Sequence, residues 1–219
     1  MPLRRLLFRD LMLFVIALAA GLSITSGGLR LLRSPTRGLP YHDDFATGDS
    51  SGWVAYDGNW NVQPGIMVNE SNERGAKLVT GSAYWTNYAL DADISLTSSG
   101  DAGIIARVSE AEPGVDAYKG IYVGLRVRDE SLVAGMADHG WDETAAKPLP
   151  YPIVSNAWYH MRLEIRGCDL RVLTWPDGTT KVLDLDESLA QCPERGRIGL
   201  RSYDSGAQWK NVRVTELKN

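Results

Sequence analysis

The sequence carries few of the side chains that perform covalent chemistry. Its histidines are His42, His139 and His160, and no Gly-x-Ser-x-Gly motif, phosphate-binding glycine loop or metal-ligand spacing accompanies them. His160 falls on the polar side of an alternating segment, where a surface histidine is the simplest interpretation. We therefore expect neither nucleophilic catalysis nor a metal site built on histidine.

Paired carboxylates are the other possible source of chemistry, because glycoside hydrolysis needs two of them across a cleft. Asp91 and Asp93 are two residues apart and share one face of a strand, which favours a solvated outer face over a catalytic pair. The acidic stretch 110–116 is typical of a turn. The sequence thus predicts no catalytic residue, and we expect the protein not to be an enzyme.

The segment ADHGWDETAAKPLPYP, residues 137–152, gathers side chains that could bind a ligand. An aromatic ring stacks on the apolar face of a sugar while acids bind its hydroxyls, and tryptophan and tyrosine also anchor protein interfaces. A third interpretation is structural, with the tryptophan capping the end of the domain and the prolines stiffening a turn. The candidate ligand or partner loop consists of Asp138, His139, Trp141, Asp142 and Tyr151.

Arg126 and Arg128 are two residues apart, which places them on one strand face. Together they could bind a carboxylate in a bidentate manner. The interpretation that we favour is that they are solvated, or form ion pairs with Asp91 or Asp93 on a neighbouring strand.

Two cysteines, Cys168 and Cys192, lie 24 positions apart. They could form a disulfide if the domain faces an oxidising compartment, and the sequence leaves the bonded and free states open. Neither has a Cys-x-x-Cys or histidine neighbour, which argues against zinc.

Residues 11–29 are an uncharged, largely apolar run between arginines. As a helix at about 1.5 Å per residue, the run approaches the ~30 Å thickness of a bilayer core. We predict a signal-anchor helix, although Ala17-Leu18-Ala19 could also serve as a signal-peptidase site. The predicted anchor residues are Leu11, Phe14, Ile16, Leu18, Leu22 and Leu29. We expect a single-pass membrane protein with a cytoplasmic N-terminus and a periplasmic or extracellular domain, although the arginine count specifies the orientation weakly.

The remaining chain divides into a tail at 1–10, a proline-containing linker at 30–42 and a β domain at 43–219. The segment 158–167 shows strict apolar–polar alternation, which predicts a half-buried strand. Pro64-Gly65 and the Pro-Asp-Gly of 176–178 predict hairpin turns. About ten such strands, with no capped amphipathic helix after the anchor, predict an antiparallel β-sandwich or barrel.

Charge excludes some partners. The formal net charge is -4, but residues 41–219 hold 17 basic and 26 acidic residues. An acidic domain argues against nucleic acid as a partner.

Five stretches occur in a fixed order, HDDF (42–45), DGNWNVQPGIM (57–67), NYALDADISL (87–96), NAWYHMRLEIRG (156–167) and GRIGLRSYDSGAQWKNVRV (196–214). This order resembles concanavalin A-like and laminin-G-like jelly-roll domains, among them family 66 carbohydrate-binding modules and 3-keto-disaccharide-hydrolase-type domains. The resemblance implies an all-β, antiparallel jelly-roll sandwich. It leaves function open, because such domains bind sugars, cleave glycosides or join larger assemblies.

Many domains that this chain resembles hold a structural calcium between acids near the domain start and an aspartate in the last strand. The resemblance therefore raises the question of a calcium site here. Asp43 and Asp44 are present here, but Lys210 occupies the position of that aspartate. An ammonium group cannot ligate calcium, which requires oxygen donors. We expect no cofactor, with Asp43 and Asp44 as weak calcium candidates.

These observations favour a non-catalytic, membrane-anchored β-sandwich that acts as an accessory subunit or interaction module of a larger membrane complex, of respiratory or photosynthetic type. Its partners would be membrane lipid, through the helix, and other membrane-protein subunits. The alternatives are a cell-surface carbohydrate-binding module, supported by the Trp141 segment, and a glycoside hydrolase of the 3-keto-disaccharide type, supported by the resemblance.

Overall fold

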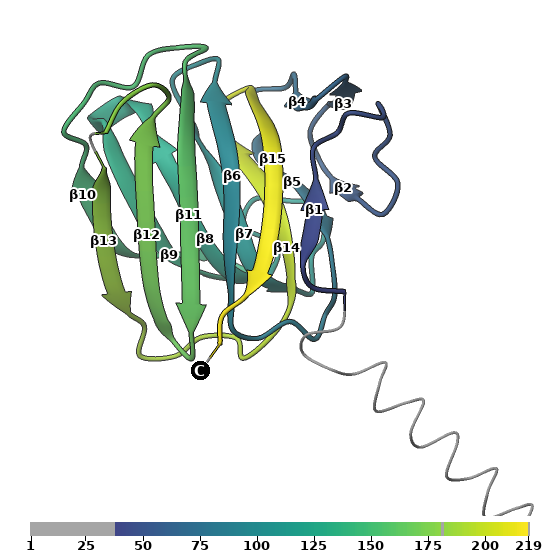
Figure 1. The fold of residues 1–219 in the computed structure, drawn as a ribbon, viewed down its shortest axis with the longest axis vertical. Helices are drawn as coiled ribbons and strands as arrows, with labels where there is room; N and C mark the ends of the chain where they lie inside the picture. The colour runs from purple at the N-terminus through teal and green to yellow at the C-terminus, as the bar shows by residue number, and fades with distance from the viewer. Residues whose placement is uncertain (1–37, 181, 219) are drawn as a thin grey trace, which may run out of the picture.

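The computed structural model describes residues 38–180 and 182–218, and in them the chain forms two antiparallel β-sheets stacked face to face (Figure 1). Fifteen strands and one short 3-10 helix make up this described part. The all-β antiparallel sandwich that we predicted is confirmed, with more strands than the ten expected. The predicted anchor residues between 11 and 29 lie outside the described residues, in which no helix is long and apolar enough to cross a membrane.

The first sheet has eight strands in the order β13-β12-β11-β6-β15-β4-β3, and β1 pairs with β15 beside β4. The strands are β1 (Tyr41–Asp43), β3 (Trp60–Gln63), β4 (Ile66–Asn69), β6 (Tyr88–Leu96), β11 (Trp158–Arg166), β12 (Asp169–Pro176), β13 (Leu183–Ser188) and β15 (Ala207–Glu216).

The second sheet has seven strands in the order β10-β9-β8-β7-β14-β5-β2. They are β2 (Val54–Tyr56), β5 (Arg74–Thr80), β7 (Asp101–Ser109), β8 (Lys119–Arg126), β9 (Ser131–Asp138), β10 (Trp141–Pro148) and β14 (Arg197–Tyr203). The helix η1 (Val127–Asp129) links β8 to β9. Strands that are far apart in the sequence are neighbours in this sheet: β14 lies between β7 and β5.

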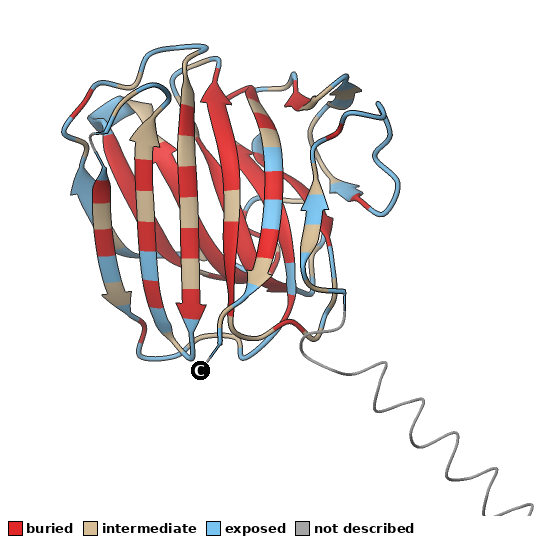
Figure 2. Ribbon diagram, in the orientation of Figure 1, coloured by how far each residue is buried: buried red, intermediate tan, exposed pale blue. Residues whose placement is uncertain are grey.

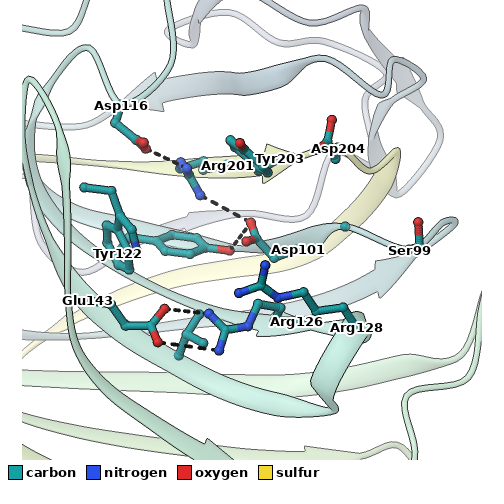
Figure 3. A pocket seen from close by; sticks show the side chains of 13 residues that line it. Ser99, Asp101, Asp116, Tyr122, Arg126, Arg128, Glu143, Arg201, Tyr203 and Asp204 are labelled. Carbon is teal, nitrogen blue, oxygen red and sulfur yellow. Dashed lines mark hydrogen bonds and ion pairs between the residues drawn. The ribbon is translucent and has the colours of Figure 1, made fainter.

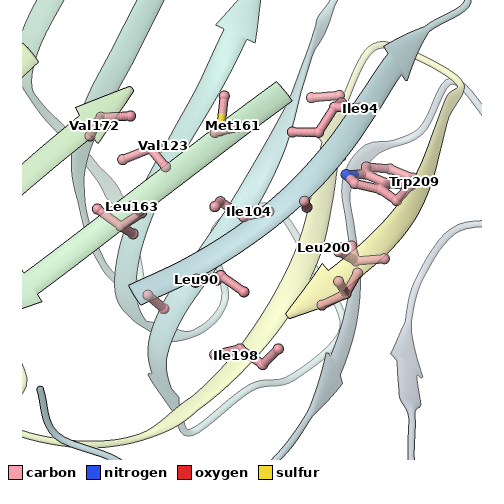
Figure 4. Packing of buried hydrophobic residues seen from close by; sticks show 14 of the residues in the cluster. Leu90, Ile94, Ile104, Val123, Met161, Leu163, Val172, Ile198, Leu200 and Trp209 are labelled. Atoms are coloured by element: carbon pink, nitrogen blue, oxygen red, sulfur yellow. The ribbon is translucent and has the colours of Figure 1, made fainter. Parts of the chain in front are cut away.

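Alternation in the sequence determines which side chains enter the core. On β11, Tyr159, Met161, Leu163 and Ile165 are all at most 1% exposed, while the residues between them are not buried (Figure 2). Their apolar side chains meet those of the second sheet in one continuous core between the sheets (Figure 4). The burial of every second side chain makes the main favourable contribution to the packing of the two sheets.

Both hairpins predicted from turn residues are present. Gln63 and Ile66 are paired across the Pro64-Gly65 turn, and β12 pairs with β13 across the segment that contains 176–178. The sandwich begins at β1, whose Tyr41 pairs with Val214. This start lies two residues before the one we expected, because the β15 edge offers the linker a strand partner.

The structure joins Cys168 to Cys192 by a disulfide, with a Cα–Cα distance of 5.6 Å. The bond ties the turn between β11 and β12 to the connection that precedes β14. Arg107, which is 1% exposed, reinforces the same place by donating to the carbonyls of Gly167 (2.6 Å) and Pro193 (2.7 Å).

Candidate functional site

The outer face of the seven-stranded sheet carries a polar site. Alternation along the central strands divides their side chains between the two faces: Ala102 and Ile121 enter the core, whereas Asp101 and Tyr122 point to the opposite side. A cavity of about 620 Å³ lies there. We call it the Arg201 cavity, after the side chain that connects its parts (Figure 3).

Arg201, from β14, lies at the base of the cavity and is 3% exposed. Its Nη1 donates to Asp101 Oδ1 at 3.3 Å and its Nη2 to Asp116 Oδ1 at 2.6 Å. The guanidinium also lies over the Tyr122 ring, 4.4 Å from the centroid. A buried cation needs such partners, because burial without them would be costly. Its Nε is buried and has no hydrogen-bond partner among the described residues.

Asp116 reaches Arg201 from the loop between β7 and β8, residues 110–118, which folds over the sheet. Lys77 supports this loop from below: its Nζ donates to the carbonyls of Gly75 (2.9 Å) and Gly114 (2.7 Å). Burial lowers the pKa of Lys77 to about 8. The segment that we predicted to be an acidic turn thus contributes a buried carboxylate to the site.

Tyr122 and Asp101 form the second polar contact of the base, with the tyrosine hydroxyl donating to Asp101 Oδ1 at 3.0 Å. Gly124 makes room for this hydroxyl, since a Cβ at that position would lie 2.0 Å from the Tyr122 oxygen. Burial raises the pKa of Asp101 above its ordinary value, although the charge of Arg201 and the Tyr122 hydrogen bond act in the opposite direction. The carboxyl therefore lies in a cavity with an increased tendency to hold a proton.

An aromatic wall stands at one side of the cavity. Trp141 meets Tyr122 edge to face, with ring centroids 5.6 Å apart, and is partly exposed. The indole lies against Gly135 of β9, where a Cβ would be 2.7 Å from its ring. Tyr203, half-buried, lines the cavity at the β14 side. Binding sites for sugars and other small molecules commonly contain aromatic rings beside polar groups that are held in place.

Arg126 and Arg128 line the same cavity, but neither pairs with the aspartates that we expected. Arg126 Nε donates to Asp129 at 2.8 Å and its Nη1 to Glu143 at 2.5 Å. The hydrogen bonds from Arg126 lower the pKa of Asp129 to about 2. The predicted pairing with Asp91 or Asp93 is wrong, because those aspartates belong to the other sheet.

The candidate segment 137–152 is largely a strand, not a loop, and its five predicted residues do not converge. Asp138 pairs with Lys119 at 3.6 Å and His139 Nε2 lies 3.3 Å from Glu110, both at the exposed β9–β10 turn. Alternation on β10 turns Asp142 away from the cavity side of Trp141 and Glu143. Tyr151 is a core residue, 8% exposed and stacked on Tyr159. Of the five, Trp141 alone lines the cavity.

The outer face of the eight-stranded sheet has a second, shallower hollow of about 540 Å³. Asp91 accepts two hydrogen bonds from Arg162 Nη1 at 2.8 Å. Asp93, 7% exposed, lies 2.5 Å from His160 Nδ1 and accepts a bond from Asn211 at 2.6 Å. The expectation of a solvated acidic face is therefore wrong for Asp93. Its neighbours on the adjacent strands, His160 and Asn211, bury its carboxylate and form hydrogen bonds with it.

The carboxylates of the calcium candidates, Asp43 and Asp44, accept hydrogen bonds from nearby residues. Both carboxylate oxygens of Asp43 accept hydrogen bonds, from the Phe45 backbone at 2.9 Å and the Trp53 indole at 2.8 Å. Asp44 accepts one from Ala46 at 3.0 Å. Lys210, at the position of the relatives' aspartate, lies over the Trp158 ring at 4.2 Å. Between residues 38 and 180, and between 182 and 218, no group of three or more His, Cys, Asp or Glu is placed to hold a metal ion.

Sequence reasoning missed most of the cavity because its residues come from five strands and four connections. One signal was available: Arg201 interrupts the apolar run of β14 and Asp101 opens that of β7, and a charge on a central strand indicates a paired, buried group.

Comparisons with known proteins concern the domain that carries this site. The family model described as the 3-keto-alpha-glucoside-1,2-lyase-like domain matches residues 42–215. No curated protein matches the sequence. Among solved structures, the carbohydrate-binding module CBM66 from Bacillus subtilis is similar with a TM-score of 0.64 and 18% identity, over 75% of this chain and 96% of that one.

Two further structures share the fold. The exoplasmic/lumenal domain of VIP36 in its Ca²⁺/Man₃GlcNAc-bound form has a TM-score of 0.59 and 13% identity, over 76% of this chain and 86% of that one. A xylan beta-1,4-xylosidase from Bacillus halodurans C-125 has a TM-score of 0.59 and 14% identity, and the 81% of this chain that aligns spans only 39% of that enzyme. At these identities the likeness shows the jelly-roll sandwich.

Proposed function

Because the chain belongs to the family of 3-keto-alpha-glucoside-1,2-lyase-like domains, we propose that it binds carbohydrate and that the sugar lies in the Arg201 cavity. This was the second of our sequence-based hypotheses, and it now takes precedence over the accessory subunit. Its support from comparison is that similar sandwiches are a carbohydrate-binding module and a domain solved with Man₃GlcNAc.

The observation that carries the proposal is the combination of an aromatic wall with polar groups that are already held in place. Trp141 offers a partly exposed ring that a sugar can cover with its C–H face. Asp101 and Arg201 are fixed by each other and by Tyr122, so they lose little freedom when a hydroxyl binds. The cavity volume of about 620 Å³ lies within the ordinary range for small-ligand sites.

The test is retention of the purified full chain on a broad panel of immobilised glycans. Wild type should be retained by at least one glycan, and Trp141→Ala should weaken that binding by about tenfold or more, as the loss of a stacked aromatic costs roughly 1–3 kcal/mol.

Trp175→Ala is the matched control, because Trp175 is a partly buried tryptophan on the other sheet, packed on His160 at 5.2 Å. It should bind as wild type does. Absence of retention across the panel, or equal losses in the two variants, would reject the proposal.

A second candidate is cleavage of the bound sugar, as the description of the family suggests. One observation favours it: burial raises the pKa of Asp101, which suits a carboxyl that exchanges a proton in a cavity. The same binding experiment separates the two functions. A binding module returns the glycan intact, whereas a lyase or hydrolase returns shorter products and loses that activity in Asp101→Asn.

A further inference from the structure

All but one of the charged side chains that line the Arg201 cavity form ion pairs with described residues. Asp101 and Asp116 are paired with Arg201, and Glu143 with Arg126. Asp204, at the rim, is paired with Arg74, 3.2 Å away. Arg128 remains, and in the described part of the chain it has no hydrogen bond or ion pair with any residue. It is thus the one charged lining side chain that forms no hydrogen bond or ion pair with a described residue, and its charge acts only at a distance on the neighbouring Asp129.

The backbone of Arg128 is held although its side chain is not. Arg128 is the middle residue of η1, and both ends of that turn are tied: Val127 N–H donates to Gly100 O at 3.1 Å, and Glu130 N–H to Val127 O at 3.2 Å. Figure 3 shows its guanidinium pointing into the cavity. An exposed arginine on an anchored turn presents its donors to a ligand at a smaller entropic cost than one on a free loop.

Arg126 cannot compete with Arg128 for a ligand. Three of its N–H groups are already directed at Asp129 and Glu143, at 2.5–2.8 Å for the shorter contacts. Nor can the cavity carboxylates turn to Arg128 without releasing Arg201, Arg126 or Arg74. A ligand with a negatively charged group could pair with Arg128 by accepting two parallel hydrogen bonds from its guanidinium.

We propose that the Arg201 cavity recognises acidic sugars, in which a carboxylate or sulfate group on the ring pairs with Arg128. This inference rests on the proposed function, because it names the class of carbohydrate that the same cavity takes. A neutral sugar could use the aromatic wall and the Arg201 base, but it would leave Arg128 bound only to water.

The experiment measures binding of the full chain to uronate oligosaccharides, each compared with its own methyl ester, and to sulfated oligosaccharides, each compared with its desulfated form. Each pair differs in the anionic group alone. The acidic member should bind about tenfold or more tightly at low salt, since hydrogen bonds to charged groups contribute roughly 1.5–3 kcal/mol. The preference should decrease as salt increases. The two series show whether carboxylate or sulfate is the group recognised.

Arg128→Gln should bind the acidic and neutral members equally. Arg195→Gln is the control, because Arg195 is an exposed arginine that lies over Tyr84, at 5.5 Å, outside the cavity; it should keep the full preference. Arg128→Lys, which keeps the charge without the fork, should keep part of it.

The outcomes separate this inference from the function on which it rests. Equal binding of acid and ester by wild type, or a preference that survives Arg128→Gln, overturns the inference and leaves carbohydrate binding in place. Failure to bind any member of either series, together with the whole glycan panel, overturns both.

Discussion

At the scale of single residues, the cavity depends on a buried arginine that serves two carboxylates. Arg201 joins a strand residue, Asp101, to a loop residue, Asp116, and covers the ring of Tyr122. The loop 110–118 is thereby held over the sheet by Arg201 through Asp116, in addition to the Lys77 hydrogen bond to Gly114. Ligand binding and local stability are consequently coupled at this point.

Arg201→Met should lower the free energy of unfolding by about 3–5 kcal/mol, because it leaves the buried carboxylate of Asp116 and the half-buried carboxylate of Asp101 without their cation. Chemical denaturation measures the change. Adding Asp101→Asn and Asp116→Asn to the variant should recover part of the loss, since the uncompensated charges are then removed.

Arg74→Met provides the comparison for this prediction. Its ion pair with Asp204 is largely exposed, with side-chain exposures of 62% and 46%, so the expected loss is about 0–1 kcal/mol. Similar losses in Arg201→Met and Arg74→Met would contradict the role assigned to Arg201.

At the scale of elements, the eight-stranded sheet ends in the β12–β13 hairpin, whose one strand neighbour in the described sheet is β11. The Cys168–Cys192 disulfide joins the segment before this hairpin to the segment after it, and the Arg107 hydrogen bonds to Gly167 and Pro193 hold the same two segments to β7. They close a loop of 24 positions that contains two strands. Cross-linking such a loop stabilises a fold mainly by restricting the unfolded chain.

The double variant Cys168→Ser, Cys192→Ser should therefore lose about 3 kcal/mol of stability, the amount expected for closure of a loop of this length. Thermal unfolding with and without reductant measures it. Wild type in reductant should match the double variant, and the double variant should not respond to reductant. An unchanged midpoint in both would show that the hairpin is fixed by other contacts.

At the scale of the whole molecule, the two outer faces of the sandwich differ in kind. The Arg201 cavity lies on the face of the seven-stranded sheet, whereas the hollow of the other sheet is lined by mutually paired Asp91, Arg162, Asp93 and His160. A glycan can reach the Arg201 cavity only if the face of the seven-stranded sheet is exposed to the solvent that contains the glycan. The location of the protein therefore determines which glycans the cavity can contact.

We propose that residues 11–29 anchor the chain to a membrane and hold the sandwich on its periplasmic or extracellular side. The full chain should then remain in the membrane fraction after carbonate extraction, because an apolar run of that length inserts into the bilayer and resists extraction. A variant with Leu18→Arg and Leu22→Arg should be released. A mature N-terminus near residue 20 would show instead that the segment is a cleaved signal peptide.

Local patterns in the sequence determined the elements of this protein and their inward faces. The alternation of residues 158–166 predicted β11 with its buried side chains, and Pro64-Gly65 predicted the turn between β3 and β4, because strand faces and turns depend on neighbours a few residues apart. The resemblance carried by five ordered stretches predicted the jelly-roll sandwich.

Only the tertiary structure decided which polar side chains meet. Asp101, Tyr122 and Arg201 are separated by as many as 100 positions, and they converge because β14 pairs with β7 and β7 with β8. Sequence spacing joined Trp141 to Tyr151, yet one lines the cavity and the other is in the core. Strand order and register set these neighbours, and both result from packing the whole domain, which no local window of residues contains.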